Sequence, residues 1–168
     1  NALNITLQNN LADIHSSKID YFFLDLEQND PLNTPDFRFI TTDRGEVEWN
    51  DGNGLFYGLT EIHMERISTS ISFGRDWHYL SQDTVLGERN LLIRRTPIIS
   101  LENGQVLGHL YISVVLNRNL SLIDQLQVAS NSDAVIMMIG DTAIASTIKP
   151  EEPLYSEVLE DLNQDDTG

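Results

Sequence analysis

The residue types best suited to binding chemistry in this sequence are two arginines and a group of aromatic side chains. Arg94 and Arg95 are adjacent in a stretch typical of a β-strand, so their side chains point to opposite faces and one of them can be aimed inward. An inward guanidinium near aromatic rings, here Trp77 and Tyr79, can hold a ligand carboxylate through two parallel hydrogen bonds. The alternative is an arginine that pairs with an acidic side chain and stacks on Trp49 or Trp77.

A second candidate is the polar run at residues 50–54, whose composition resembles a calcium-binding loop. The run lacks the alternating ligands and the distant glutamate of such loops, and Asx turns account for it more simply. The aromatic residues after it are suited to a core, but part of such a cluster can be the exposed anchor of a protein contact. The candidate partner-binding residues are Asp51, Asn53, Phe56, Tyr57, Trp77 and Tyr79.

Catalytic and metal-binding patterns are not found in the sequence. The chain has no cysteine, which excludes disulfides, thiolate nucleophiles and thiolate metal sites. It has no glycine-rich phosphate loop before a helix and no His-Glu-x-x-His motif, and its four histidines fall on separate predicted elements. A hydrolytic enzyme would rest only on abundant carboxylates. We therefore expect no catalytic residue, no metal site and no cofactor in this chain.

The charge of the chain restricts its partners. Its 26 acidic and 10 basic residues give a formal net charge of −16, which argues against binding to nucleic acid or to an anionic membrane surface. The acidic surface serves solubility or faces a basic patch on a partner. No run of about 18 apolar residues and no signal peptide occurs, so we expect that nothing here crosses a membrane by itself. If the parent is a membrane protein, the chain is a piece of it.

The predicted elements begin with an amphipathic helix over residues 3–14. Residues 19–26 are rich in β-branched and aromatic side chains and are predicted to form a strand. A loop over 28–36 with two prolines leads to a second strand at 37–41. The hairpin at 43–45 places Gly45 where a left-handed conformation is needed. In the strand after it, Val47 and Trp49 are predicted to share one face, opposite Glu46 and Glu48.

The next segment is predicted to be a helix followed by three strands. Thr60 can cap a helix that runs to about Ser70, with Leu59 and Met64 spaced as a hydrophobic staple. Strands follow at 77–80, 90–99 and 105–116, and Asn103-Gly104 is a strong hairpin signal between the last two. The alternating apolar residues of the last strand predict that it is central to the sheet. This order predicts an α+β fold, with an antiparallel sheet flanked by helices, that resembles PAS-like or Cache-like sensors.

The rest of the chain repeats the beginning of such a module. Residues 119–130 are predicted to form a connecting helix, and residues 134–146 a strand, a two-residue turn and a strand. Two strands and a helix cannot close a sheet of their own. We therefore predict a first PAS-like module at 1–118, the connecting helix, and an incomplete second PAS-like module at 131–168.

Seven sequence stretches stand out as specific motifs: YFFL at 21–24, DP at 30–31, TPDFRF at 34–39, DGN at 51–53, FYG at 56–58, LIRRTPI at 92–98 and GQVLG at 104–108. With these motifs, the chain from about residue 19 to residue 146 resembles the periplasmic region of the LuxQ family, the autoinducer-2 sensor kinase/phosphatases of Vibrio-type bacteria. The match to the family is less clear after residue 148.

The resemblance implies two tandem PAS-like modules in the periplasm, between two membrane helices of an inner-membrane protein. It also implies cytoplasmic kinase and receiver parts that use ATP and lie outside this chain. In such proteins the periplasmic region docks LuxP, a periplasmic autoinducer-2-binding protein, and relays its ligand state across the membrane, with self-association of the receptor. The alternative is a PAS or Cache sensor that binds a small carboxylate directly, with Arg94, Arg95, Trp77 and Tyr79 around the pocket.

Overall fold

The computed structural model describes residues 16–30, 34–71 and 76–158, and the chain divides into two compact units, Asn1–Val115 and Leu116–Gly168. The predicted helix over residues 3–14 lies outside the described residues.

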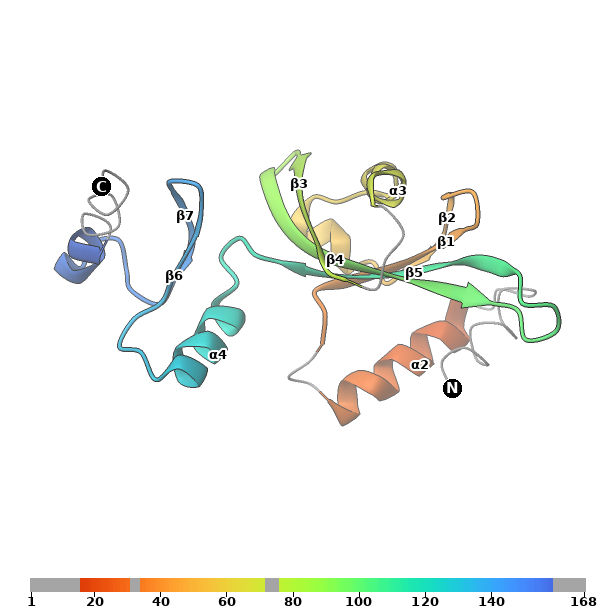
Figure 1. Cartoon of the computed structure of the whole chain (residues 1–168), viewed down its shortest axis with the longest axis horizontal. Helices are drawn as coiled ribbons and strands as arrows, with labels where there is room; N and C mark the ends of the chain where they lie inside the picture. Colours follow the sequence, from red (N-terminus) through yellow and green to blue (C-terminus); the bar gives the residue numbers. More distant parts are fainter. Residues whose placement is uncertain (1–15, 31–33, 72–75, 159–168) are drawn as a thin grey trace. The chain divides into compact units, whose positions relative to one another are not determined.

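The first unit is built on a five-stranded antiparallel sheet with the order β2-β1-β5-β4-β3 (Figure 1). The strands are β1 (Phe37–Thr42), β2 (Val47–Asn50), β3 (His78–Thr84), β4 (Gly87–Ile99) and β5 (Val106–Val115). The long strand β5 is in the centre of the sheet, as its alternating apolar pattern predicted. The predicted α+β class with a PAS-like antiparallel sheet is confirmed.

One face of the sheet carries helix α3 (Glu61–Ser70) and the short 3₁₀ helix η2 (Asn53–Tyr57). Thr60 precedes α3, and its backbone N–H donates a hydrogen bond to Nδ1 of His63 at 3.1 Å. Leu59 and Met64, the two staple positions, are both buried in the core under this helix, as predicted. This core consists of Phe37, Phe39, Leu59, Met64, Ile67, Ile71, Leu91, Ile93, Tyr111 and Val115.

The other face of the sheet carries helix α2 (Ser16–Asn29), so the predicted strand at 19–26 is wrong (Figure 1). The aromatic and β-branched composition of this stretch favours a strand, but its apolar residues also recur at helical spacing. Ile19 and Phe23 are one helical turn apart and are both buried against the sheet. Burial of two such side chains contributes about 1.5–3 kcal/mol each, which outweighs the weaker local preference for a strand.

A β-bulge in β2 overturns the predicted placement of Val47 and Trp49 on one face. Thr41 is paired with Val47, whereas Ile40 is paired with Trp49, so one extra residue lies between the two pairs. The extra residue reverses the alternation of side chains. Val47 therefore packs against the core under α3, and Trp49 packs with Ile40 on the side of α2.

The turns of the first unit follow the predicted glycines. Gly45 has φ of 92° in the β1–β2 turn, and Gly104 has φ of 73° in the turn between β4 and β5. Both values lie in the left-handed region that glycine adopts without steric cost. The predicted loop at 28–36 begins at Asp30, because α2 continues to Asn29, and residues 31–33 lie outside the described ranges.

The second unit contains α4 (Leu120–Ser130) and a two-stranded antiparallel sheet of β6 (Ile136–Ile139) and β7 (Thr142–Ser146). The side chain of Asn119 accepts a hydrogen bond from the backbone N–H of Leu122 at 2.9 Å and caps the helix. The predicted strand, turn and strand are confirmed. The interpretation of this unit as an incomplete second PAS-like module stays a prediction.

Candidate functional site

The candidate loop at residues 50–54 is held by Asx turns. The side-chain oxygen of Asn50 accepts a hydrogen bond from the backbone N–H of Gly52, and Oδ1 of Asp51 accepts one from the N–H of Asn53, both at 3.0 Å. Oδ2 of Asp51 also accepts the backbone N–H of Arg38 at 2.9 Å. Asp51 and Asn53 therefore fix the start of η2. In the described part of the chain, no three histidine or acidic side chains gather in a way that could hold a metal ion.

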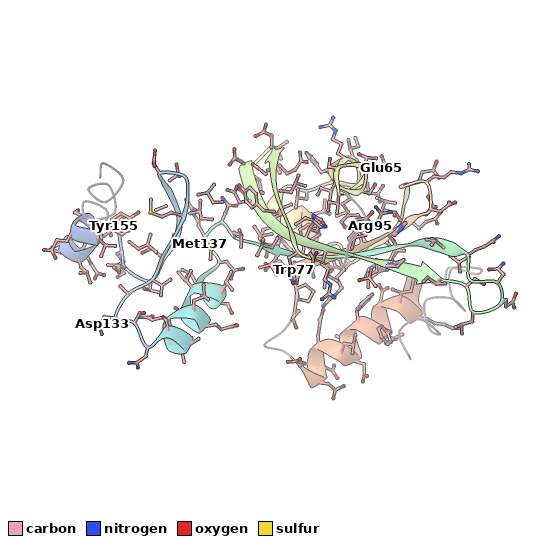
Figure 2. The ribbon with its side chains drawn as sticks, viewed as in Figure 1. Glu65, Trp77, Arg95, Asp133, Met137 and Tyr155 are labelled. Atoms are coloured by element: carbon pink, nitrogen blue, oxygen red, sulfur yellow. The ribbon has the colours of Figure 1, made fainter. Side chains whose placement is uncertain are left out.

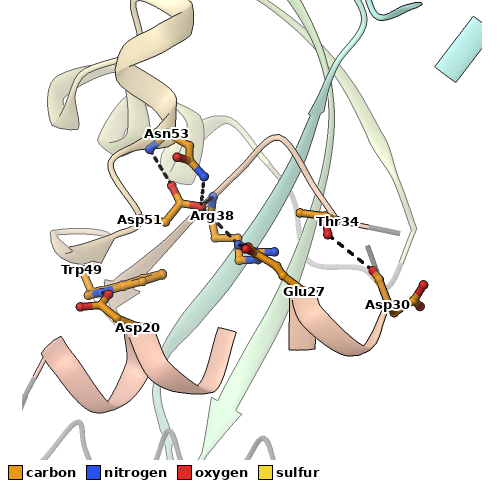
Figure 3. A network of polar contacts seen from close by, with 8 residues as sticks. All are labelled: Asp20, Glu27, Asp30, Thr34, Arg38, Trp49, Asp51 and Asn53. Carbon is orange, nitrogen blue, oxygen red and sulfur yellow. Dashed lines mark hydrogen bonds and ion pairs between the residues drawn. The ribbon is translucent and has the colours of Figure 1, made fainter. Parts of the chain in front are cut away.

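Arg38 links this loop to α2 through two carboxylates (Figure 3). Its Nη1 lies 2.6 Å from Oε1 of Glu27 and 3.5 Å from Oδ2 of Asp51. The guanidinium also lies over the ring of Phe23, with 4.9 Å between its carbon and the ring centroid. Burial raises the pKa of Asp51, although the hydrogen bond from Asn53 and the charge of Arg38 act in the opposite direction.

A second polar contact ties α2 to the sheet on the same side. Nε1 of Trp49 donates a hydrogen bond to Oδ1 of Asp20 at 3.0 Å (Figure 3). The indole also stacks on the ring of Phe23, with 5.3 Å between centroids. The bulge that turns Trp49 toward α2 is what makes both contacts possible.

The two aromatic residues of η2 have different environments. Tyr57 packs against the core under α3, and its hydroxyl donates a hydrogen bond to Oδ1 of Asp36 at 2.9 Å. Burial, followed by the charge of Asp36, raises the pKa of Tyr57 to about 12. Phe56, by contrast, is 78% exposed. Of the two predicted contact residues, Phe56 is thus the one that presents an apolar ring to solvent.

Phe56 belongs to an exposed apolar surface formed by two segments that are far apart in the sequence. The turn between β3 and β4 lies against η2, because Oγ1 of Thr84 donates to the carbonyl oxygen of Tyr57 at 3.4 Å and Nε of Arg89 donates to the same oxygen at 3.2 Å. A Cβ placed on Gly58 would lie 3.1 Å from Cγ of Leu86, so the two chains are in close contact there. We name this surface the η2 patch: Leu55 (63% exposed), Phe56 (78%), Val85 (88%) and Leu86 (54%).

The other predicted contact residues, Trp77 and Tyr79, lie at the opposite end of β3 from the η2 patch. Both are about half exposed, and the hydroxyl of Tyr79 donates a hydrogen bond to the side chain of Asn90 at 2.6 Å. Val85 is six positions after Tyr79 in the sequence, which corresponds to about 20 Å along a strand. The structure therefore does not bring the two predicted contact regions together.

Arg94 and Arg95 lie on opposite faces of the sheet, as predicted. Arg95 is on the side of α3, where Nη1 donates to the carbonyl oxygen of Ile71 at 3.2 Å and Nη2 lies 2.8 Å from Nε2 of His109 (Figure 2). Burial and the nearby guanidinium lower the pKa of His109. The ring of Tyr111 lies under the same guanidinium at 5.9 Å.

Arg94 is on the other face and lines a cavity between α2 and the sheet. The cavities beside the two arginines include neither Trp77 nor Tyr79 in their walls. The aromatic neighbours are instead Phe23 for Arg94 and Tyr111 for Arg95.

Comparison with known proteins places the chain in a family. The sequence model of the family described as "LuxQ, periplasmic" matches residues 1–167. The chain belongs to the LuxQ periplasmic family. This confirms the resemblance that the sequence motifs indicated, and with it the assignment of the chain to a periplasmic region. None of the helices within the described ranges is both long and apolar enough to cross a membrane.

Several relatives carry the name autoinducer 2 sensor kinase/phosphatase LuxQ. The protein from Vibrio vulnificus is 44% identical over 153 residues, which is 91% of this chain and 18% of the relative. The protein from Vibrio cholerae is 32% identical over 152 residues, which is 90% of this chain and 18% of the relative. The chain therefore spans less than a fifth of the length of these curated relatives.

A solved LuxQ structure has the same fold. The crystal structure of the periplasmic domain of Vibrio cholerae LuxQ matches with a TM-score of 0.81 and 32% sequence identity. The match covers 91% of this chain and 68% of that chain.

Proposed function

We propose that this chain is the periplasmic sensor region of a quorum-sensing hybrid histidine kinase/phosphatase. In this role it docks the autoinducer-2-binding protein LuxP and relays the ligand state of LuxP across the inner membrane. Catalysis and ATP binding belong to cytoplasmic parts of the parent, outside this chain. The membership of the LuxQ periplasmic family and the names of the relatives support this assignment.

The observation that carries the docking proposal is the η2 patch. Large exposed apolar side chains that cluster at one place on a soluble domain are typical of protein interaction sites. Phe56 has the features of an anchor residue, since it is a large aromatic side chain on a short helix whose backbone is fixed by Asp51. The chain as a whole is acidic, with a formal net charge of −16, which favours a partner face with basic residues around an apolar centre.

The signal acts through the difference between two binding affinities. Autoinducer-2 can shift the receptor only by as much as the ligand-bound and ligand-free forms of LuxP differ in their affinity for its signalling states. A tenfold difference in affinity corresponds to about 1.4 kcal/mol. The docking surface therefore has to distinguish two forms of the partner.

Calorimetric titration of the chain with LuxP of the same organism, with and without autoinducer-2, tests the proposal. We expect binding in at least one state and a different Kd in the other. Phe56→Ser should weaken binding about 30-fold, because an aromatic anchor contributes about 2 kcal/mol or more. Leu101→Ser is the matched control, since Leu101 is 70% exposed in the turn between β4 and β5. Absence of binding by the complete periplasmic region in both states would refute the proposal.

A further inference from the structure

The cavity beside Arg94 has the size and lining of a small-molecule site. It lies between α2 and the sheet and has a volume of about 310 Å³, which is within the range of ligand pockets in proteins. Phe23 and Leu26 line it from α2, and Leu110 and Ile112 line it from β5. These four side chains give the cavity an apolar part. Its polar and charged lining residues are Glu27, Asp30, Thr34, Arg38, Arg94 and Thr96.

Arg94 makes no direct ion pair within the described ranges, although Glu27 and Asp30 line the same cavity. The side chain of Arg94 forms no hydrogen bond or ion pair with any residue in the described ranges, although it is partly buried. Arg38, which lines the same cavity, is in a different state, because Glu27 and Asp51 lie within 4 Å of its guanidinium. Arg94 is thus the cation in this cavity whose hydrogen-bond donors are available to an incoming group.

A guanidinium beside an apolar wall selects one chemical class of ligand. Two parallel N–H donors match the two oxygens of a carboxylate, and partial burial strengthens such a contact. The side chains of Phe23, Leu26, Leu110 and Ile112 can cover an apolar body of the same ligand. A strongly hydrated anion without an apolar part would leave this wall unused.

We propose that the cavity between α2 and the sheet binds a small amphipathic carboxylate, with Arg94 holding the carboxylate and the apolar wall covering the body. The ligand bridges α2 and β4 and stabilises the packing of α2 on the sheet. This is a direct chemical input to the sensor region, and it is independent of docking at the η2 patch. A failure of this proposal leaves the docking proposal untouched.

Calorimetric titration of the whole chain with hexanoate, hexanol and inorganic phosphate tests the proposal. We expect saturable binding of hexanoate, with no saturable binding of the uncharged alcohol or of phosphate. Arg94→Met should weaken hexanoate binding about 10- to 100-fold, because it removes charge-assisted hydrogen bonds and retains an apolar side chain of similar length. Arg44→Met, an exposed arginine in the turn between β1 and β2, should leave binding unchanged.

A second variant keeps the guanidinium and closes the cavity. Thr96 is exposed and lines the cavity, so Thr96→Tyr should obstruct the entrance without disturbing the core. We expect it to weaken hexanoate binding as well, and we expect hexanoate to slow amide exchange in α2 of the unmodified chain. Equal binding by Arg94→Met, equal binding of phosphate, or absence of hexanoate binding at 10 mM would each overturn the proposal.

Discussion

The contact between α2 and the sheet is predicted to depend on Arg38. Removing one partner of a buried ion pair typically costs about 3–5 kcal/mol, because the remaining charge is left buried without compensation. Arg38→Met leaves the carboxylates of Glu27 and Asp51 without their cation. Asp51 has a side chain that is 10% exposed and keeps its backbone hydrogen bonds, while Glu27 is 32% exposed and can be hydrated. We therefore expect a loss of about 3 kcal/mol, at the lower end of this range.

Glu27→Gln is the comparison variant for this prediction. It removes the more exposed carboxylate and leaves Arg38 paired with Asp51, so we expect a loss of only about 1 kcal/mol. A double mutant of both positions should cost less than the sum of the two single changes, since the residues share one network.

Urea unfolding followed by tryptophan fluorescence measures these differences. The chain has two tryptophans, and Trp77→Phe leaves buried Trp49 beside α2 as the only reporter. For a slope of about 2 kcal/mol per molar urea, a loss of 3 kcal/mol lowers the midpoint by about 1.5 M. A decrease below about 0.5 M for Arg38→Met, or an equal decrease for Glu27→Gln, would refute the reasoning from buried charge.

Three further predictions concern single positions. The pKa of His109 is lowered in the folded state, so the unfolded chain binds more protons than the folded chain below about pH 6.5. The free energy of unfolding should therefore decrease as the pH falls through this range. A pH series of urea titrations should show a smaller decrease for His109→Gln. Gly58→Ala should cost more stability than Gly52→Ala in the same assay, because both glycines have positive φ but only at Gly58 would a Cβ lie 2.9 Å from Oγ1 of Thr84; equal costs would contradict this. Leu59→Ala should lower the free energy of unfolding by about 2–5 kcal/mol, since the side chain is fully buried in the core under α3, and a loss below about 1 kcal/mol would contradict it.

The sheet was largely predictable from the sequence, because its signals are local. Gly45 and Gly104 mark turns that need a left-handed residue, and the alternation in β1 and β5 fixes which side chains face each core. The helix α3 was predictable from Thr60 and its staple positions for the same reason. The misassignment of α2 has a physical cause, since Ile19 and Phe23 fit a strand by composition and a helix by spacing. Their burial against the sheet, which is a tertiary contact, decides between the two.

The candidate sites were less predictable, because they depend on contacts between distant segments. Phe56 was identified from its aromatic character, but Val85 and Leu86 were not, since nothing in the sequence near residue 56 indicates that the β3–β4 turn lies beside it. The cavity beside Arg94 is likewise formed by α2, which the sequence assigned to a strand. Only the opposite directions of Arg94 and Arg95 followed from the alternation of a strand.

The bulge in β2 also bears on the behaviour of many copies of this chain in one compartment. Within the described residues β2 pairs with β1 alone, so its other side is an edge of the sheet. Long, flat edges are templates on which a second chain can add a strand and begin to aggregate. Here the edge strand is four residues long and locally twisted by the bulge, and it carries the acidic side chain of Glu48, with Glu46 directly before it. The same irregularity that turns Trp49 toward α2 therefore disfavours the addition of a strand from a neighbouring molecule at this edge of the sheet.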